Sequence, residues 1–247
     1  MDDTQLTEDR VLNGHIRLRQ KAGGYRAGMD AALLAAACDV GPGERVIEAG
    51  CGVGGALLAA AARRLDSRFH GVERDLQAAE LARGNAALNG MSDRVEITTG
   101  DIEAGFRALG LPVFDAAISN PPFFDDPGAL RAPSPAKTGA WLADGGLAAW
   151  TSFLLKAVRE GGAITIIHRA DRLADILALL APKAGSFKVR PIQPFADAPA
   201  KRVIVRAIKT GKAPLVLLPA LVLHERDGGQ HSTAAEAILR GEADLGW

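Results

Sequence analysis

Asn120, Pro121, Pro122 and Phe123 combine an amide, two imino acids and an aromatic ring directly after a short apolar run. The side-chain oxygen of Asn120 and the carbonyl oxygen of Pro121 could each accept a hydrogen bond from one N–H of a planar amine. The prolines fix φ and restrict the preceding residue, so the acceptors would keep a set spacing. Phe123 offers a face for stacking a base. The motif indicates a clamp for a planar amine, although a strand ended by prolines and followed by buried phenylalanines also fits.

A second group of residues forms a glycine-rich turn, VIEAGCGVGG, between a strand pattern and a helix pattern. Glycines such as Gly50 and Gly52 permit a tight turn and a close approach of the backbone to a ligand. Glu73 follows the next strand, about 20 residues on, where an acid could hold a ribose diol. The pattern favours a nucleoside cofactor, and a glycine-rich turn without a ligand is the alternative.

Two further acids lie at predicted strand ends. Glu48 precedes the glycine turn and could contact the same ligand, or could be a capping or solvated acid. Asp101 follows the third strand, where it too could contact the ligand. An aspartate at this place could also cap the start of a helix, and both roles are compatible.

The elements that must position these residues alternate between strand and helix from residue 44 onward. This alternation predicts a mostly parallel sheet covered on both faces, in which ligands bind beyond the carboxyl ends of the strands. The predicted strands are 45–50, 68–73, 94–101, 114–119 and 163–169, and the predicted helices are 56–65, 75–90, 147–160 and 171–183.

Both ends of the chain depart from the alternation. Residues 187–192 and 201–209 are strand patterns joined by a loop, which predicts an antiparallel hairpin at the sheet edge. Residues 16–19 alternate apolar and basic side chains, which predicts a small hairpin with Ala22-Gly23-Gly24 as its turn. We therefore expect residues 1–40 to form a basic hairpin and a helix that pack on a domain of residues 41–247, giving one compact unit.

Bulk composition narrows the class of protein. The chain has 247 residues, a formal net charge of +0 and two cysteines without ligand-type spacing. This predicts a reducing compartment and argues against a disulfide scaffold or a metal site. The acidic, polar start is no leader peptide, and no apolar run reaches the roughly 20 residues that span a bilayer. We expect a cytoplasmic protein without a membrane partner.

Basic residues cluster locally in two segments, 15–26 and 183–212. In the second segment Asp197 is the only acid, and in the first the basic residues from His15 to Arg26 have none between them. Such clusters suit contacts to phosphates of RNA. Ordinary solvated charges on edge strands explain the same residues.

Taken in order, EAGCGVGG, Glu73 and NPPF resemble the class I S-adenosylmethionine-dependent methyltransferases that act on amino groups. The segment LNGHIRLRQKAGGYRAGMDAALLAAA is similar to the start of the bacterial tRNA-Val adenine-N6 methyltransferase family. HRADRLADIL, KRVIVRAIKTG and LLPALVLHERDGG resemble that family in order and spacing. The resemblance covers nearly the whole chain and implies a Rossmann-like fold with a seven-stranded sheet.

The resemblance also implies roles for individual residues. The catalytic clamp would be Asn120, Pro121, Pro122 and Phe123. The contacts to S-adenosylmethionine would come from Tyr25, Arg26, Gly28, Asp30, Glu48, Gly50, Gly52, Glu73, Asp101 and Asn120. In this arrangement Asp101 would face the adenine amino group of the cofactor. Two places depart from the family pattern. Met29 stands where threonine is common, and GAWLADGG stands where an Ala-Arg-His-Glu run is common.

The resemblance thus predicts methylation of the exocyclic N6 amine of an adenine in tRNA, beside the anticodon of a valine tRNA. A protein glutamine amide or a small-molecule amine is an alternative substrate, and a non-catalytic module that binds RNA is an alternative class. The chain would be a monomer or a homodimer.

Overall fold

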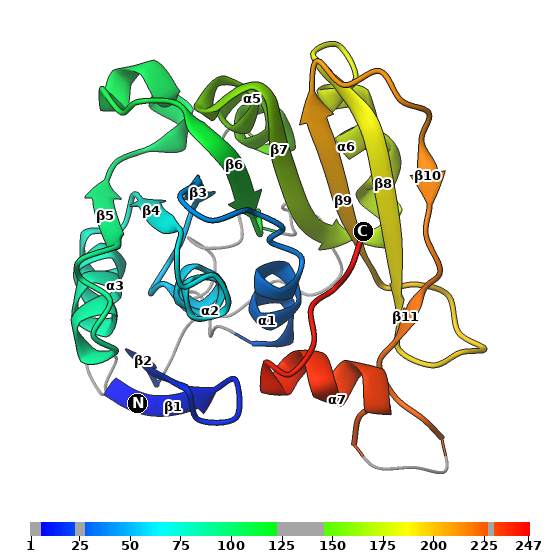
Figure 1. The fold of residues 1–247 in the computed structure, drawn as a ribbon, viewed down its shortest axis with the longest axis horizontal. Helices are drawn as coiled ribbons and strands as arrows, with labels where there is room; N and C mark the ends of the chain where they lie inside the picture. Colours follow the sequence, from blue (N-terminus) through cyan, green and yellow to red (C-terminus); the bar gives the residue numbers. More distant parts are fainter. Residues whose placement is uncertain (1–5, 23–27, 123–145, 227–229) are drawn as a thin grey trace.

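The computed structural model describes residues 6–22, 28–122, 146–226 and 230–247, which form two layers of helices around one central sheet (Figure 1). The strands are β1 (Leu6–Val11), β2 (Ile16–Lys21), β3 (Arg45–Ala49), β4 (Arg68–Glu73), β5 (Val95–Thr99), β6 (Phe114–Ser119), β7 (Val158–Arg169), β8 (Ala184–Gln193), β9 (Arg202–Lys209), β10 (Val216–Leu217) and β11 (Leu221–Val222). The α-helices are α1 (Met29–Ala36), α2 (Gly55–Arg63), α3 (Leu76–Leu88), α5 (Gly146–Ala157), α6 (Leu173–Leu180) and α7 (Thr233–Arg240). Short 3₁₀ turns are η1 (Ile102–Ala104), η2 (Phe106–Leu109) and η3 (Ala170–Arg172).

The central sheet contains the seven strands that the sequence predicted. Its order is β10-β8-β9-β7-β6-β3-β4-β5, and β11 also pairs with β8. Strands β3, β4, β5, β6 and β7 are parallel to one another, whereas β9 is antiparallel to both β7 and β8. The two-residue strands β10 and β11 extend the sheet to nine strands, which the sequence did not indicate. The mostly parallel α/β fold with a C-terminal antiparallel hairpin is therefore confirmed.

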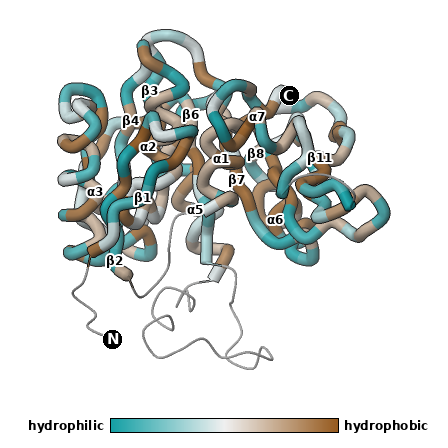
Figure 2. The backbone as a smooth tube through the Cα atoms, turned by 90° about the horizontal axis from the view of Figure 1, so that it is seen from below, coloured by the Kyte–Doolittle hydropathy of each residue, from teal (hydrophilic) through white to brown (hydrophobic). Residues whose placement is uncertain are grey.

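Two hydrophobic clusters cover the two faces of the sheet. On one face, buried side chains of α1, α2 and α3 pack on alternate residues of the strands, such as Val46 and Ile118. On the other face, α5 and α6 pack on the intervening residues, such as Ile47 and Ala117. This alternation follows from the opposite directions of successive side chains in a strand. Figure 2 shows hydrophilic residues on the outer turns at both ends of the molecule.

An N-terminal hairpin is present, and its turn precedes residues 16–19. β1 pairs with β2 in antiparallel register, and the turn between them is residues 12–15. Gly23 and Gly24 of the predicted turn lie outside the described residues. Leu12, Asn13 and Gly14 all have positive φ, at 51°, 54° and 89°. An Asn-Gly pair tolerates that conformation and is a strong hairpin signal. The acidic segment before it is therefore a strand.

Helix boundaries agree with the sequence in some places and differ from it in others. Asp75 caps α3 by accepting the Ala78 N–H at 2.8 Å. The predicted helix 147–160 ends at Ala157, because the chain already enters β7 at Val158. The sequence did not indicate α7, which Ser232 caps and Gly241 ends in a left-handed conformation. None of the helices in the described ranges is long and apolar enough to cross a membrane.

Candidate active site

The sheet register brings the predicted functional residues to one edge. Ala49 pairs with Ser119 on one side and with Val72 on the other. Gly50 and Asn120, the next residues of β3 and β6, therefore leave neighbouring parallel strands side by side, about 5 Å apart by the ordinary strand spacing. Glu73 ends the third strand in this row. Parallel topology thus places the glycine turn, the acid and the Asn-Pro-Pro segment around one space.

The glycine turn has two positions that only glycine fits comfortably. Gly50 has a φ of 68°, and a Cβ there would lie 2.2 Å from Cη2 of Trp150 in α5. Gly50 therefore lets the indole pack under the turn. Gly52 has a φ of 54°, and a Cβ there would meet no atom within 4 Å. The space beside Gly52 is open, as a turn that receives a ligand requires.

Glu73 holds the glycine turn in place. One carboxyl oxygen accepts the Gly52 N–H at 2.8 Å, and the other accepts the Asp75 N–H at 2.9 Å. Each carboxylate oxygen can accept a further hydrogen bond. Glu73 can therefore fix the turn and still receive a hydroxyl group of a ligand. Its predicted contact with a ribose diol stays a prediction.

Glu48 is buried beneath the turn. Its side chain lies within β3, and the residue is only 3% exposed. Burial raises its pKa to about 8, while a hydrogen bond from the Leu57 backbone lowers the pKa and the charge of Glu73 raises it further. Its Oε2 atom is buried without a hydrogen-bond partner in the described part of the chain. Glu48 is therefore not the solvated acid that the sequence left open.

Asp101 caps the first 3₁₀ turn by accepting the Glu103 N–H at 2.9 Å. The capping role proposed from sequence is thus present, and contact with adenine stays a prediction. Gly28 caps α1 in an extended conformation, and Asp30 in the first turn of α1 receives Arg202 Nε at 3.2 Å. Tyr25 and Arg26 lie outside the described residues.

Two buried polar side chains flank the Asn-Pro-Pro segment. Ser119 donates from Oγ to the Ala49 carbonyl at 3.0 Å, which links the end of β6 to the start of the glycine turn. His168, fully buried in β7, lies with Nε2 3.3 Å from the Pro122 carbonyl. A carbonyl only accepts, so this nitrogen carries the proton in that contact. Asn120 and Pro122 are partly buried and Pro121 is buried, whereas Phe123 lies outside the described residues.

Sequence reasoning missed some residues that support the site. Trp150 was not among the predicted site residues, yet its ring packs against Gly50. Ser119 was assigned only to the strand, although a hydroxyl at a buried strand end is an available signal. Asn85 was counted as an ordinary helix residue, yet it is 1% exposed and bonds the turn at Val53. The signal that could have identified Asn85 is the second asparagine, Asn89, four residues later in the same alanine-rich segment.

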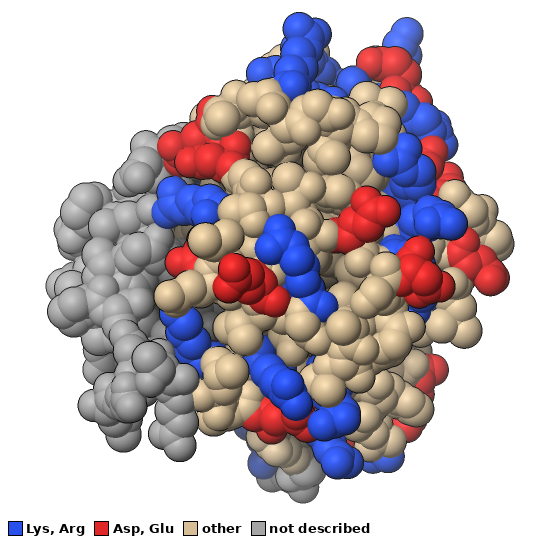
Figure 3. Space-filling view, turned by 90° about the vertical axis from the view of Figure 1, so that its left-hand side faces the viewer, with Lys and Arg blue, Asp and Glu red and all other residues tan. Residues whose placement is uncertain are grey.

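Neither basic segment forms a simple patch. In the hairpin, Arg17 and Arg19 both pair with Glu8 on the neighbouring strand, at 2.8 and 3.2 Å. Figure 3, which views the side of α3 and β5, shows charges of both signs interspersed. Several residues of the 183–212 segment are also paired with acids: Arg202 with Asp30, Arg206 with Asp39, and Lys209 with Glu160.

Metal-binding chemistry has no geometric support in the described ranges. They contain no group of three or more His, Cys, Asp or Glu side chains that could hold a metal ion. Cys38 and Cys51 are buried free thiols. Burial raises the pKa of both thiols, that of Cys38 to about 12, so neither is a ready thiolate.

Comparisons with known proteins place residues 25–132 in the methyltransferase small domain family. A tRNA1(Val) (adenine(37)-N6)-methyltransferase of Porphyromonas gingivalis is 39% identical over 121 residues, which is 47% of this chain and 47% of the relative. The enzyme of that name from Phocaeicola vulgatus is 32% identical over 143 residues, covering 58% and 55%. The chain spans about half the length of these relatives. The enzyme of that name from Trichodesmium erythraeum is 28% identical and covers 80% of the chain and 83% of the relative.

Solved structures agree on the fold. A predicted O-methyltransferase of Agrobacterium tumefaciens is 27% identical with a TM-score of 0.74, covering 87% of this chain and 98% of that one. TrmN of Thermus thermophilus, at 21% identity and a TM-score of 0.51 over 73% of this chain and 47% of its own, shares the fold. The family resemblance seen in the sequence is thereby confirmed. Residues 25–132 thus match a methyltransferase domain, and the chain has the fold of the class I methyltransferases.

Proposed function

We propose that this protein transfers a methyl group from S-adenosylmethionine to the exocyclic N6 amine of an adenine in tRNA, the adenine beside the anticodon of a valine tRNA. The observation that carries the proposal is the register of β3 with β6, in which Ala49 pairs with Ser119. This register sets the glycine turn beside Asn120. The relatives of Porphyromonas gingivalis and Phocaeicola vulgatus are named for that tRNA and that adenine.

The residues around the turn fit the cofactor. Gly52 has open space where a Cβ would stand, and Glu48 has a buried oxygen without a partner in the described part of the chain. Gly50, Gly52 and Glu73 would hold the cofactor by backbone and carboxylate contacts, with Glu48, Asp101, Gly28 and Asp30 around them. When bound, S-adenosylmethionine supplies an electrophilic methyl carbon on a sulfonium.

The chain itself would contribute two acceptors and a fixed geometry. Asn120 Oδ1 and the Pro121 carbonyl would each accept a hydrogen bond from one amine N–H, which would align the nitrogen lone pair away from the ring. These acceptors would orient the amine nitrogen as the nucleophile toward the methyl group that the bound cofactor supplies, and the surplus amine proton would pass to solvent. Because both acceptors are neutral and held by prolines, catalysis rests mainly on orientation. Pro122 would fix the segment, and Phe123 would stack on the base.

The RNA contacts belong to the proposal as well. We place these contacts in the basic segments 15–26 and 183–212. Within the two segments, only the basic side chains that lie near the site would contact RNA. Arg202 pairs in register with Arg169 at the carboxyl end of β7, and Lys201 beside it is exposed. Phosphate contacts there would hold an anticodon loop whose unpaired adenine is cheaper to splay out than a base of a duplex.

The test is methyl transfer from radiolabelled S-adenosylmethionine into total RNA from cells that lack this modification. We expect label in tRNA, recovered as N6-methyladenosine on nucleoside analysis. Label in tRNA at another nucleoside would contradict the adenine assignment. Cofactor binding without any labelled RNA would contradict the tRNA assignment and would favour a protein glutamine amide or a small-molecule amine. An RNA-binding module without transfer would bind tRNA in the same preparation and leave it unlabelled.

A further inference from the structure

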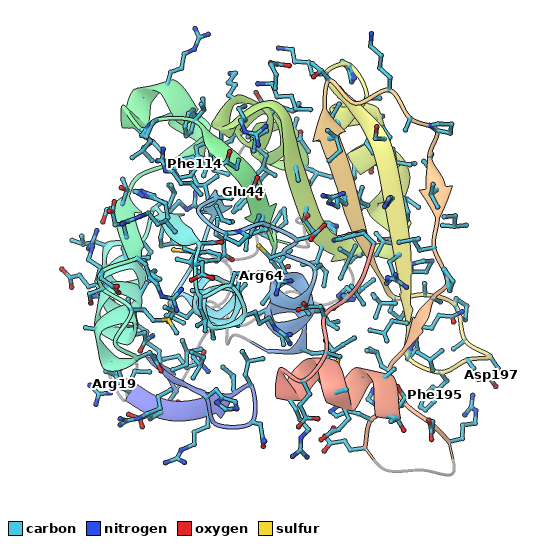
Figure 4. The ribbon with its side chains drawn as sticks, in the orientation of Figure 1. Arg19, Glu44, Arg64, Phe114, Phe195 and Asp197 are labelled. Atoms are coloured by element: carbon cyan, nitrogen blue, oxygen red, sulfur yellow. The ribbon has the colours of Figure 1, made fainter. Side chains whose placement is uncertain are left out.

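Two asparagines, Asn85 within α3 and Asn89 at its C-terminal cap, attach the N-terminal hairpin to the domain. Asn89 Oδ1 accepts the Arg17 N–H at 2.9 Å, and Asn89 Nδ2 donates to the Arg17 carbonyl at 2.7 Å. Asn85 repeats the pair with Arg19, at 2.8 and 2.9 Å. Each side-chain amide thus pairs with a strand residue as the backbone of a neighbouring strand would. Figure 4 labels Arg19 where the hairpin meets α3.

Geometry explains why two asparagines four residues apart can do this. Four residues of α-helix rise about 6 Å, and two residues of strand rise about 6.6 Å. Side chains at i and i+4 along α3 and its cap therefore match alternate residues of β2. The two asparagines satisfy backbone groups of β2 that would otherwise be an open strand edge.

The third hydrogen bond of each asparagine differs. Asn89 Nδ2 also donates to the Asn85 carbonyl within α3, at 2.7 Å. Asn85 Nδ2 instead donates to the Val53 carbonyl in the glycine turn, at 2.9 Å. Asn85 is 1% exposed, so its amide cannot exchange this partner for water. One buried side chain therefore joins the hairpin to the turn between β3 and α2.

We infer that Asn85 is a positioning residue that couples the docking of the N-terminal hairpin to the binding of the cofactor. The inference rests on the proposed function, because it assumes that residues 50–54 receive S-adenosylmethionine. Val53 is partly buried, so its carbonyl would be less able than an exposed group to replace a lost partner with water. Loss of Asn85 would leave the Val53 carbonyl unsatisfied and would let the turn move away from its binding geometry.

The two asparagines supply a matched experiment. Asn85→Ala and Asn89→Ala each remove the two bonds to β2, so both should lower the thermal stability and speed hydrogen exchange of the hairpin amides. We expect only Asn85→Ala to raise the Kd for S-adenosylmethionine, by about tenfold over Asn89→Ala in titration calorimetry, which is the scale for one partly buried carbonyl left without its partner. Equal Kd values for the two variants would overturn the inference, since a purely structural role would affect both alike.

A second measurement covers the case in which Asn85→Ala fails to fold. In the unaltered chain, saturating S-adenosylhomocysteine should slow exchange of the Arg17 and Arg19 amides severalfold, because a fixed turn fixes Asn85. Unchanged exchange at both amides would contradict the coupling. If the unaltered chain binds no cofactor, the proposed function falls and this inference falls with it. Cofactor binding with no effect on the hairpin would overturn this inference alone.

Discussion

Polar residues are distributed differently in two parts of the sheet. One part is the set of parallel strands β3, β4, β5, β6 and β7, and the other is the antiparallel pair of β8 and β9. The parallel strands all end at the same edge, so residues far apart in the chain meet there: Glu73, Gly50 and Asn120. In the antiparallel pair, by contrast, a single basic segment reaches both edges. Lys201 and Arg202 lie at the carboxyl end of β7, whereas Lys183 and Lys209 lie at the opposite end.

The difference shows what a linear pattern can carry into space. Seven residues of strand, from Ala163 to Arg169, separate the ends of the β7–β9 pairing, a distance of about 20 Å at the ordinary rise. When a motif directly follows a parallel strand, the topology fixes the edge of the sheet at which the motif lies. The position of a run of basic residues along a hairpin is not fixed in this way. The strand register places some of these residues at one edge of the sheet and some at the other, and it places acidic side chains beside several of them.

The largest effect should come from the edge where the parallel strands end. Asn120→Ala should lower kcat for methyl transfer by about 10²–10³-fold, the scale for losing one transition-state hydrogen bond. The Kd for S-adenosylmethionine and the melting temperature should change little, since the side chain acts on the amine. Asn120→Asp, which keeps an acceptor oxygen, should retain more activity than the alanine variant. Unchanged transfer by a folded Asn120→Ala protein would refute the clamp.

Two glycines of the turn should separate stability from cofactor binding. Gly50→Ala forces a Cβ against Trp150 at a positive φ, so it should lower the free energy of unfolding by about 3 kcal/mol. Gly52→Ala meets no neighbour and should cost only about 1 kcal/mol of strain, yet it should weaken cofactor binding. Urea unfolding and calorimetry measure the two quantities. Equal stability losses for both variants would contradict the packing of Trp150 under Gly50.

Glu48 should make stability depend on pH. Its pKa is raised from 4.5 to about 8 in the folded protein, so its contribution to stability is full below pH 4.5 and falls as the pH rises through 8. Each pH unit in that window can cost up to about 1.4 kcal/mol. Glu48→Gln should therefore gain stability relative to the unaltered chain between pH 5 and pH 8 in urea unfolding. A difference that stays constant with pH would show that Glu48 ionises normally.

The smallest effect concerns the antiparallel pair. Lys201→Ala should weaken tRNA binding a fewfold, because one exposed phosphate contact contributes modestly. The slope of the logarithm of the binding constant against the logarithm of the salt concentration should become shallower by about one. Lys183→Ala, at the other end of the sheet, should leave binding unchanged. Filter binding at several salt concentrations distinguishes the two variants. Equal losses would mean that RNA covers both edges.

Much of the fold could be predicted because strand and helix patterns are local. The strands around Glu48 and Ser119 and the helix after Asp75 follow from apolar periodicity and turn residues. The failures were places where another signal dominated. The acidic strand β1 lacks an apolar run, and its hairpin turn at Asn13-Gly14 was overlooked. Helix α7 has only eight residues, and its Ser232 cap and its buried Ala235 and Ile238 become evident only in the fold.

The sequence alone determined which chemistry is present: the glycine spacing, the acids after the strands and the Asn-Pro-Pro-Phe motif. Only the tertiary structure decided which of these groups is buried, paired or open. Glu48 lies under the turn, Glu8 pairs with two arginines of the hairpin, and Asn85 reaches Val53 across 32 residues of chain. The physical reason is that burial and long-range hydrogen bonds depend on register and packing, which no local pattern specifies.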